Sequence, residues 1–432
     1  MNKHHRLWAA LLLGVLFFPL PAHGKEGNVV LCVPGISIDI KRPKTVWGEK
    51  IHDAGDRWSG MVGFFQKSGY VFGGTITAHT EPPQPRRPGR EKKVFLLVFS
   101  REAVVDGLAM KGMELAQALE KVKRLTGAKR ITLVGHSAGG LVARAYMQGG
   151  ISGIPYRGDV DRLITISTPH FGSVLATSVG DYLGTRATSL QAGAALIRRL
   201  NDRLPLPADV LYASIVVRGQ LSDFNRQGEQ FLPYVVKKRY DALPLSFKRG
   251  GDQVIQSVNQ NLALAGTAAK YERRTGRPIV YPLVVVAPPS RPTDRPEMNK
   301  IHNHAMGTEV LQKTVLSLVE RDMFWRPVPL REKSDWITRE ARFFAMDAMT
   351  EKALAGHMFQ EIVAVHLTFF APRLQATDLV AAEFSGEVAS RLLGFSAKEL
   401  TTTMSGRLSC RYDRFGRAQT VSAHMEEVGR GN

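Results

Sequence analysis

The fold is decided by residues 131–146, which read ITLVGHSAGGLVARAY. Residues 131–134 are mostly apolar and predict a short buried strand, while residues 141–146 favour a helix. Between them stands GHSAG at 135–139, a G-x-S-x-G pattern that would place Ser137 at the apex of a tight strand-to-helix turn. The flanking glycines have a physical role, because they let the strand and helix pass closely and leave the serine hydroxyl exposed.

Apolar runs and helical spacings alternate along most of the chain. Further strands are predicted over 28–33, 71–78, 94–99, 163–167, 210–217 and 282–287. Helices are predicted over 47–67, 108–122, 182–200 and 308–321. Strands that read as continuous apolar runs and alternate with helices indicate a mostly parallel sheet covered on both faces. We therefore expect an α/β fold.

The first 24 residues have the features of an export signal. Lys3 and Arg6 precede an apolar run at 7–18, and PAHG at 21–24 offers small residues for cleavage. An uncleaved membrane anchor is the alternative. Because no later stretch is long and apolar enough to span a bilayer, we expect an exported protein, either periplasmic or secreted and soluble after export.

Chain length and composition shifts suggest two further units. The 432 residues suffice for one large domain, predicted at 25–326, and a small α+β appendage at 327–432. Within the large domain, residues 174–248 form a looser, lid-like insertion, whose aromatic residues and KKR at 237–239 would suit a lipid–water boundary. An ordinary solvated loop is the favoured interpretation of this insertion, with the lipid-facing lid as the alternative. In the appendage, alternating residues around 413–416 predict a hairpin.

The chain is strongly basic, with a formal net charge of +19. Residues 331–432 contain 13 basic and 13 acidic residues, so the excess lies earlier in the chain. Such a charge favours anionic partners, and for an exported protein peripheral contact with an anionic membrane surface is a better interpretation than nucleic acid. Ordinary solvated basic faces would also explain it.

The two cysteines, Cys32 and Cys410, do not form a disulfide framework, although oxidising conditions after export would permit a single bridge. No stretch has the spacing of a zinc site or a glycine-rich phosphate loop. We therefore expect no metal and no cofactor.

A serine needs a base to take its proton and a carboxylate to orient that base. In a strand–turn–helix context of this kind the chain order is serine, acid, histidine. Asp252 is the favoured acid because two glycines precede it and an apolar pair follows it at 254–255. Asp223 and Asp241 stand in less structured polar surroundings and are the substitutes.

Two histidines compete for the role of base, in IHNHAM at 301–306. His304 is preferred over His302 because it directly precedes small and apolar residues and then the last predicted helix of the large domain. The pair could instead be a His-x-His metal site, but no cysteine or carboxylate cluster accompanies it. A tetrahedral intermediate would need two backbone N–H donors, and those of Ala138 and Ile36 are the candidates.

These motifs together resemble a known family. GHSAGGLVAR at 135–144, followed by LITISTPHFGS at 163–173, is similar to the lipase branch of the α/β-hydrolase superfamily. PGI at 34–36 and the region around Trp47 and Trp58 look like the start of lecithin:cholesterol acyltransferase and GPI inositol-deacylase-like members. Asp252 falls where that family's acid sits. Two departures stand out: Pro-Gly replaces His-Gly at 34–35, and Gln253 replaces the usual glycine.

The resemblance, which covers roughly residues 28–322, implies an α/β-hydrolase fold and a Ser-Asp-His esterase or lipase acting on acyl esters, with lipids as the expected substrates. An acyltransferase that passes the acyl group to an alcohol, and a catalytically inactive fold used for binding, are the alternative functions.

Overall fold

The structure is a computed structural model that describes residues 28–35, 47–48, 59–79, 91–173, 176, 188–219, 243, 245–248, 250–287, 289, 300–327, 329–355, 360–392 and 399–431. The expected export signal, Ile36, Asp223, Asp241 and the basic run at 237–239 lie outside these residues. Within these ranges, no helix combines the length and the apolar character needed to cross a membrane.

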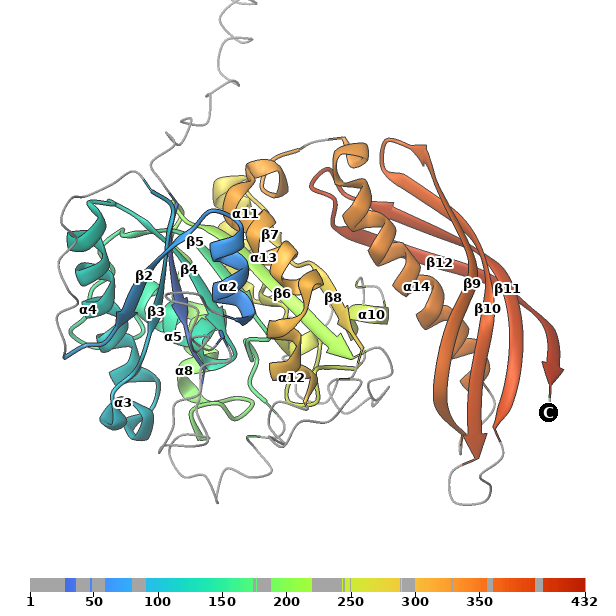
Figure 1. The fold of residues 1–432 in the computed structure, drawn as a ribbon, viewed down its shortest axis with the longest axis horizontal. Coiled ribbons are helices and arrows are strands. Elements are labelled where there is room, and N and C mark those ends of the chain that lie inside the picture. Colours follow the sequence, from blue (N-terminus) through green and yellow to red (C-terminus); the bar gives the residue numbers. More distant parts are fainter. Residues whose placement is uncertain are drawn as a thin grey trace, which may run out of the picture.

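The centre of the molecule is an eight-stranded sheet in which all paired strands are parallel (Figure 1). The strand order is β2-β3-β1-β4-β5-β6-β7, with β8 also paired to β6. The strands are β1 (Val29–Val33), β2 (Val71–Ile76), β3 (Lys93–Leu97), β4 (Ile131–His136), β5 (Val160–Ile166), β6 (Leu211–Gly219), β7 (Ile279–Val280) and β8 (Leu283–Val286). The predicted α/β class with a mostly parallel sheet is confirmed.

Both faces of this sheet are buried, and β1 shows why its sequence is apolar throughout. Leu31 and Val33 belong to a core cluster with residues of α4 (Leu108–Thr126), α5 (Ala138–Met147) and α11 (Gly266–Thr275). Val30 and Cys32 point to the opposite face, where they join a second cluster with α2 (Gly60–Lys67) and α13 (Glu309–Glu320). Alternate side chains therefore serve two cores, as the continuous apolar runs predicted.

Shorter helices complete this part of the chain: α3 (Arg101–Asp106), α8 (Ala195–Arg198), α10 (Leu245–Lys248) and α12 (Ile301–His304). The helix predicted over 182–200 is described only from residue 188 on, and there α8 continues as a π-helical turn, η2 (Arg199–Arg203).

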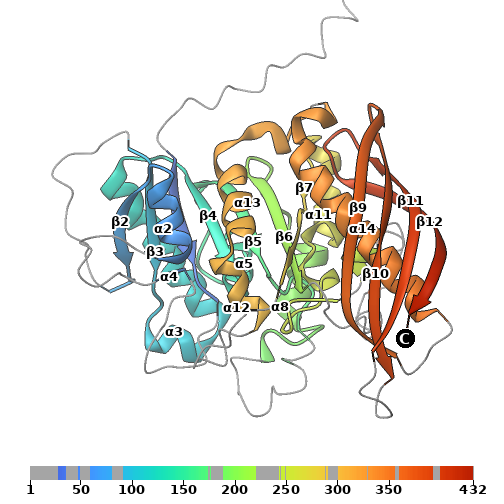
Figure 2. The ribbon, with the colours of Figure 1, turned by 45° about the vertical axis from the view of Figure 1, so that its right-hand side comes forward.

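The C-terminal region is an antiparallel meander packed on one helix. The strands β9 (Gln360–Ala376), β10 (Leu379–Leu392), β11 (Leu400–Tyr412) and β12 (Ala418–Gly431) lie in the order β12-β11-β10-β9. The helix α14 (Ser334–Leu354) lies between this sheet and the central one (Figure 2). The predicted hairpin at 413–416 is confirmed, because β11 and β12 pair on either side of it.

Polar bonds fasten α14 and the C-terminal sheet to the central sheet. Arg218 at the end of β6 forms a buried ion pair with Asp347 of α14 at 3.0 Å. Glu340, also on α14, accepts a hydrogen bond from the N–H of Leu283 at 3.4 Å. Residues on both sides of the expected boundary at 326 thus share one continuous packing arrangement.

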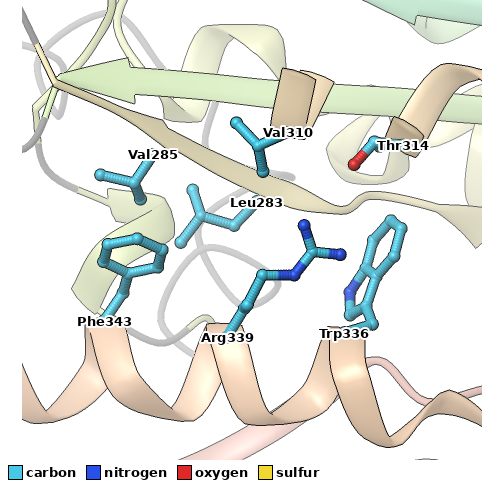
Figure 3. A pocket seen from close by; sticks show the side chains of 7 residues that line it. All are labelled: Leu283, Val285, Val310, Thr314, Trp336, Arg339 and Phe343. Atoms are coloured by element: carbon cyan, nitrogen blue, oxygen red, sulfur yellow. The ribbon is translucent and has the colours of Figure 1, made fainter. Parts of the chain in front are cut away.

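A shallow and mainly apolar pocket marks this junction (Figure 3). Its lining residues are Leu283 and Val285 of β8, Val310 and Thr314 of α13, and Trp336, Arg339 and Phe343 of α14. The two cysteines are elsewhere. Cys32 on β1 and Cys410 on β11 are both buried and free, and burial raises the pKa of each thiol.

Candidate active site

Ser137 stands on a strained turn between β4 and α5. Its backbone has φ 54° and ψ −131°, a conformation that residues with a side chain rarely adopt. The neighbouring glycines are sterically required: a Cβ on Gly139 would lie 2.3 Å from the carbonyl oxygen of Val33, and one on Gly135 would lie 2.7 Å from the nitrogen of Gly140. The strand–turn–helix context expected from the sequence is present.

The segment after β1 passes directly beside this serine. A Cβ on Gly35 would lie 2.7 Å from the Cβ of Ser137, so only glycine fits there. Ile36, the expected oxyanion donor, follows Gly35 in the chain but lies outside the described residues. Ala138 is the first residue of α5, where backbone N–H groups have no acceptor within the helix.

Asp252 is fully buried in a turn that follows β6 in the chain. One carboxylate oxygen, Oδ1, accepts hydrogen bonds from the N–H groups of Val254 at 3.0 Å and Ile255 at 2.7 Å. The other, Oδ2, lies 2.8 Å from Nδ1 of His302. The carboxylate is therefore held by its own turn and directed at one imidazole.

The histidine that meets Asp252 is His302 and not the preferred His304. The backbone N–H of His302 also donates to the carbonyl oxygen of Asp252 at 2.9 Å, so two bonds join these residues. Residues two apart on a helix project to opposite sides, and both histidines are on α12. His304 is partly exposed, and burial lowers its pKa. The sequence preference for His304 is reversed by this geometry.

The structure brings Asp252 and His302 together, but the remaining contact is not formed. Among the described residues, no hydrogen bond joins the Ser137 hydroxyl to His302. Such bonds are often long before substrate binds. No group of three or more His, Cys, Asp or Glu side chains within the described ranges could hold a metal ion, so the His-x-His interpretation has no further ligands there.

Comparisons with known proteins find similarity in the segment around the serine turn. Residues 99–185, which contain Ser137, match the family described as PGAP1-like alpha/beta domain. Triacylglycerol lipases of Pseudarthrobacter phenanthrenivorans and Burkholderia plantarii are each 35% identical over 100 residues, or 23% of this chain. The chain covers only 30% and 26% of their lengths. The Bacillus licheniformis lipase BlEst2 has a TM-score of 0.39 and 16% identity, covering 68% of this chain and 92% of that one.

The segment that carries Ser137 is therefore similar to a PGAP1-like alpha/beta domain and to triacylglycerol lipases.

A further histidine, His136, connects the serine turn to α12. Its Nε2 donates to the carbonyl oxygen of His302 at 3.1 Å, and the two rings are 4.7 Å apart between centroids. Burial, and then the neighbouring His302, lowers the pKa of His136 well below its ordinary value. A neutral His136 can therefore donate this bond without placing a charge beside His302. The sequence analysis assigned His136 no role, although it is the x before serine in G-x-S-x-G.

A buried polar network surrounds α5, the helix that follows the serine turn. Arg144 of α5 is fully buried, and its guanidinium contacts Nδ1 of His170 at 3.1 Å and donates to Oδ1 of Asn201 at 3.0 Å. Burial lowers the pKa of Arg144 to about 9. Nε2 of His170 lies 3.0 Å from the hydroxyl of Thr165 at the end of β5. This network joins α5, the segment after β5 and the π-helical turn η2 behind Ser137.

Proposed function

We propose that this protein is a hydrolase that cleaves acyl esters, with lipids as substrates, through a covalent acyl-Ser137 intermediate. The proposal assigns His302 as the base and Asp252 as the residue that orients it. The observation that carries it is the 2.8 Å contact between Asp252 Oδ2 and His302 Nδ1. Ser137 stands on a strained turn directly after His136, whose Nε2 donates to the carbonyl oxygen of His302. The lipase-like family supports the choice of acyl ester over other substrates.

The proton on His302 follows from its partner. A hydrogen bond to a carboxylate requires the proton on Nδ1, which leaves the lone pair of Nε2 free to accept a proton. In the proposed reaction, Nε2 takes the proton of Ser137 while Oγ attacks the carbonyl carbon of the ester. The same proton then goes to the leaving alcohol as the ester C–O bond breaks. A water molecule, deprotonated in the same way, hydrolyses the acyl-serine.

The oxyanion of each tetrahedral intermediate needs hydrogen-bond donors fixed before the reaction. The N–H of Ala138 is assigned one of these roles because it follows the nucleophile and begins a helix. The N–H of Ile36 is assigned the other. Gly35, the residue directly before Ile36, supports this assignment, because its backbone passes close to the side chain of Ser137.

Ester hydrolysis by the chain without residues 1–24 tests the proposal. We expect it to cleave p-nitrophenyl esters from acetyl to palmitoyl and to react with a fluorophosphonate probe, with a chain-length optimum that separates esterase from lipase. The Ser137→Ala variant should lose both, with kcat lower by about 10³-fold or more. Activity retained in that variant would refute the acyl-serine, and acylated glycerol exceeding free acid would identify a transferase.

The proposal also includes export through residues 1–24 and peripheral contact with anionic lipid, supported by the net charge of +19. The same esters presented in anionic vesicles should be cleaved faster than in neutral vesicles, and added salt should remove the difference. N-terminal sequencing of the mature protein tests export, because a protein cleaved after residue 24 should begin at Lys25.

A further inference from the structure

The residue after the acid, Gln253, has a costly backbone conformation. Its φ is +70°, and among the described residues only Ser137 and Ser167 share a positive φ without being glycine. This left-handed conformation is strained for a residue with a Cβ, whereas glycine adopts it freely. The side chain of Gln253 should therefore make a contact that glycine could not.

That contact is with the helix that carries the base. Oε1 of Gln253 accepts a hydrogen bond at 3.0 Å from the backbone N–H of Ile301, the first residue of α12. This N–H has no acceptor within the helix, and the N-cap residue Lys300 makes no side-chain capping bond. Gln253 thus caps α12 from a different part of the chain.

With this contact, three hydrogen bonds join the adjacent residues Asp252 and Gln253 to the adjacent residues Ile301 and His302. Asp252 holds the backbone N–H and the imidazole of His302, and Gln253 holds the backbone N–H of Ile301. On one side of this set the turn is stiff, because Asp252 Oδ1 binds two of its N–H groups. The side chain of Gln253 is exposed, so its loss opens no cavity in the core.

We propose that Gln253 is a positioning residue for His302: its amide oxygen fixes the start of α12 and so keeps the imidazole on Asp252. The inference rests on the proposed function. Gln253 touches neither substrate nor the reacting atoms, and it acts through the orientation of the base. Its strained left-handed backbone places the amide oxygen where it can accept the hydrogen bond from Ile301.

Three substitutions separate positioning from a structural role. Gln253→Gly removes the amide and also removes the strain of the left-handed backbone. Gln253→Asn keeps an amide, and asparagine tolerates this backbone, but its side chain is one methylene too short to reach Ile301. Gln253→Glu keeps an acceptor oxygen at the same distance from the backbone. We expect kcat for a p-nitrophenyl ester to fall about tenfold in the first two variants at unchanged KM, and to recover in the third. The melting temperature of Gln253→Gly should not fall.

A proton NMR measurement decides the inference without relying on activity. The Nδ1 proton of His302, bonded to a buried carboxylate, should give a far-downfield resonance that His302→Ala removes. We expect a sharp resonance in the wild type and in Gln253→Glu, and a broadened one in Gln253→Gly and Gln253→Asn.

An unchanged resonance in Gln253→Gly would overturn the inference, and so would unchanged kcat in an active enzyme. A wild type without esterase activity or fluorophosphonate labelling would instead refute the proposed function, while the resonance would still test the contact with α12.

Discussion

The two sheets of this protein are built in opposite ways. No strand of the central sheet exceeds nine residues, and β1, β3 and β4 are buried throughout. The strands of the C-terminal sheet have 13 to 17 residues, and β11 alternates between more and less buried positions. In the first sheet, Ser137 directly follows the carboxyl end of β4, and the Asp252 turn is hydrogen-bonded to the carboxyl end of β6. In the second, alternation determines only which face packs on α14.

The difference does not make the second region independent of the first. Arg218, which pairs with Asp347 of α14, directly precedes Gly219. The N–H of Gly219 donates to the carbonyl oxygen of Gly251 at 2.9 Å, beside Asp252. A chain of close contacts therefore runs from the C-terminal region to the turn that holds the acid, and the predictions below test how far the two regions are coupled.

The largest effect should come from the central region. The His302→Ala variant should lose about 10⁴-fold or more in kcat, because no other base is hydrogen-bonded to Asp252 among the described residues. The matched His304→Ala variant should stay within about twofold of the wild type. Ester kinetics, with melting curves as a control for folding, measure both. The reverse pattern would restore His304 as the base.

A smaller but still large effect should come from the ion pair between Arg218 of β6 and Asp347 of α14. Asp347→Ala leaves Arg218 buried at 2% exposure without this partner, which should lower the free energy of unfolding by about 3–5 kcal/mol. The matched control is Asp378→Ala, which breaks the exposed pair with Arg411 and should cost about 1 kcal/mol or less. Urea unfolding measures both. Equal effects would mean that the C-terminal region is fastened by other contacts.

The smallest effect concerns Glu340 and depends on pH. Burial raises the pKa of Glu340 from its ordinary 4.5 to about 7, so the folded protein keeps this carboxyl protonated where the unfolded chain has released its proton. The stability that Glu340 contributes is therefore present below pH 4.5 and is lost as the pH rises through 7.

Replacing Glu340 with Gln removes this titration and keeps an acceptor for the N–H of Leu283. Relative to the wild type, Glu340→Gln should gain on the order of 3 kcal/mol between pH 4.5 and pH 8. Urea midpoints measured across that range would show the gain. Parallel pH profiles for the two proteins would mean that the carboxyl does not titrate with folding.

Much of the central region could be predicted because its signals are local. The strained Ser137 needs glycines within three residues of it, and those glycines are visible in the chain. Asp252 was predicted as the acid from the residues adjacent to it, and that role stays a prediction. The C-terminal strand β9 was not predicted, because residues 354–370 show no clear period. Pro372 within β9 is tolerated because β9 is an edge strand.

The sequence by itself determined the parallel sheet and the strand–turn–helix setting of Ser137, because periodicity and short-range sterics act between neighbours in the chain. Only the tertiary structure decided that His302 and not His304 meets Asp252, since that choice depends on the rotation of a four-residue helix held by a distant turn. It also decided the contact of Gln253 with Ile301 and the pairing of Arg218 with Asp347. These contacts join residues 48 and 129 positions apart, a separation at which no local pattern carries information.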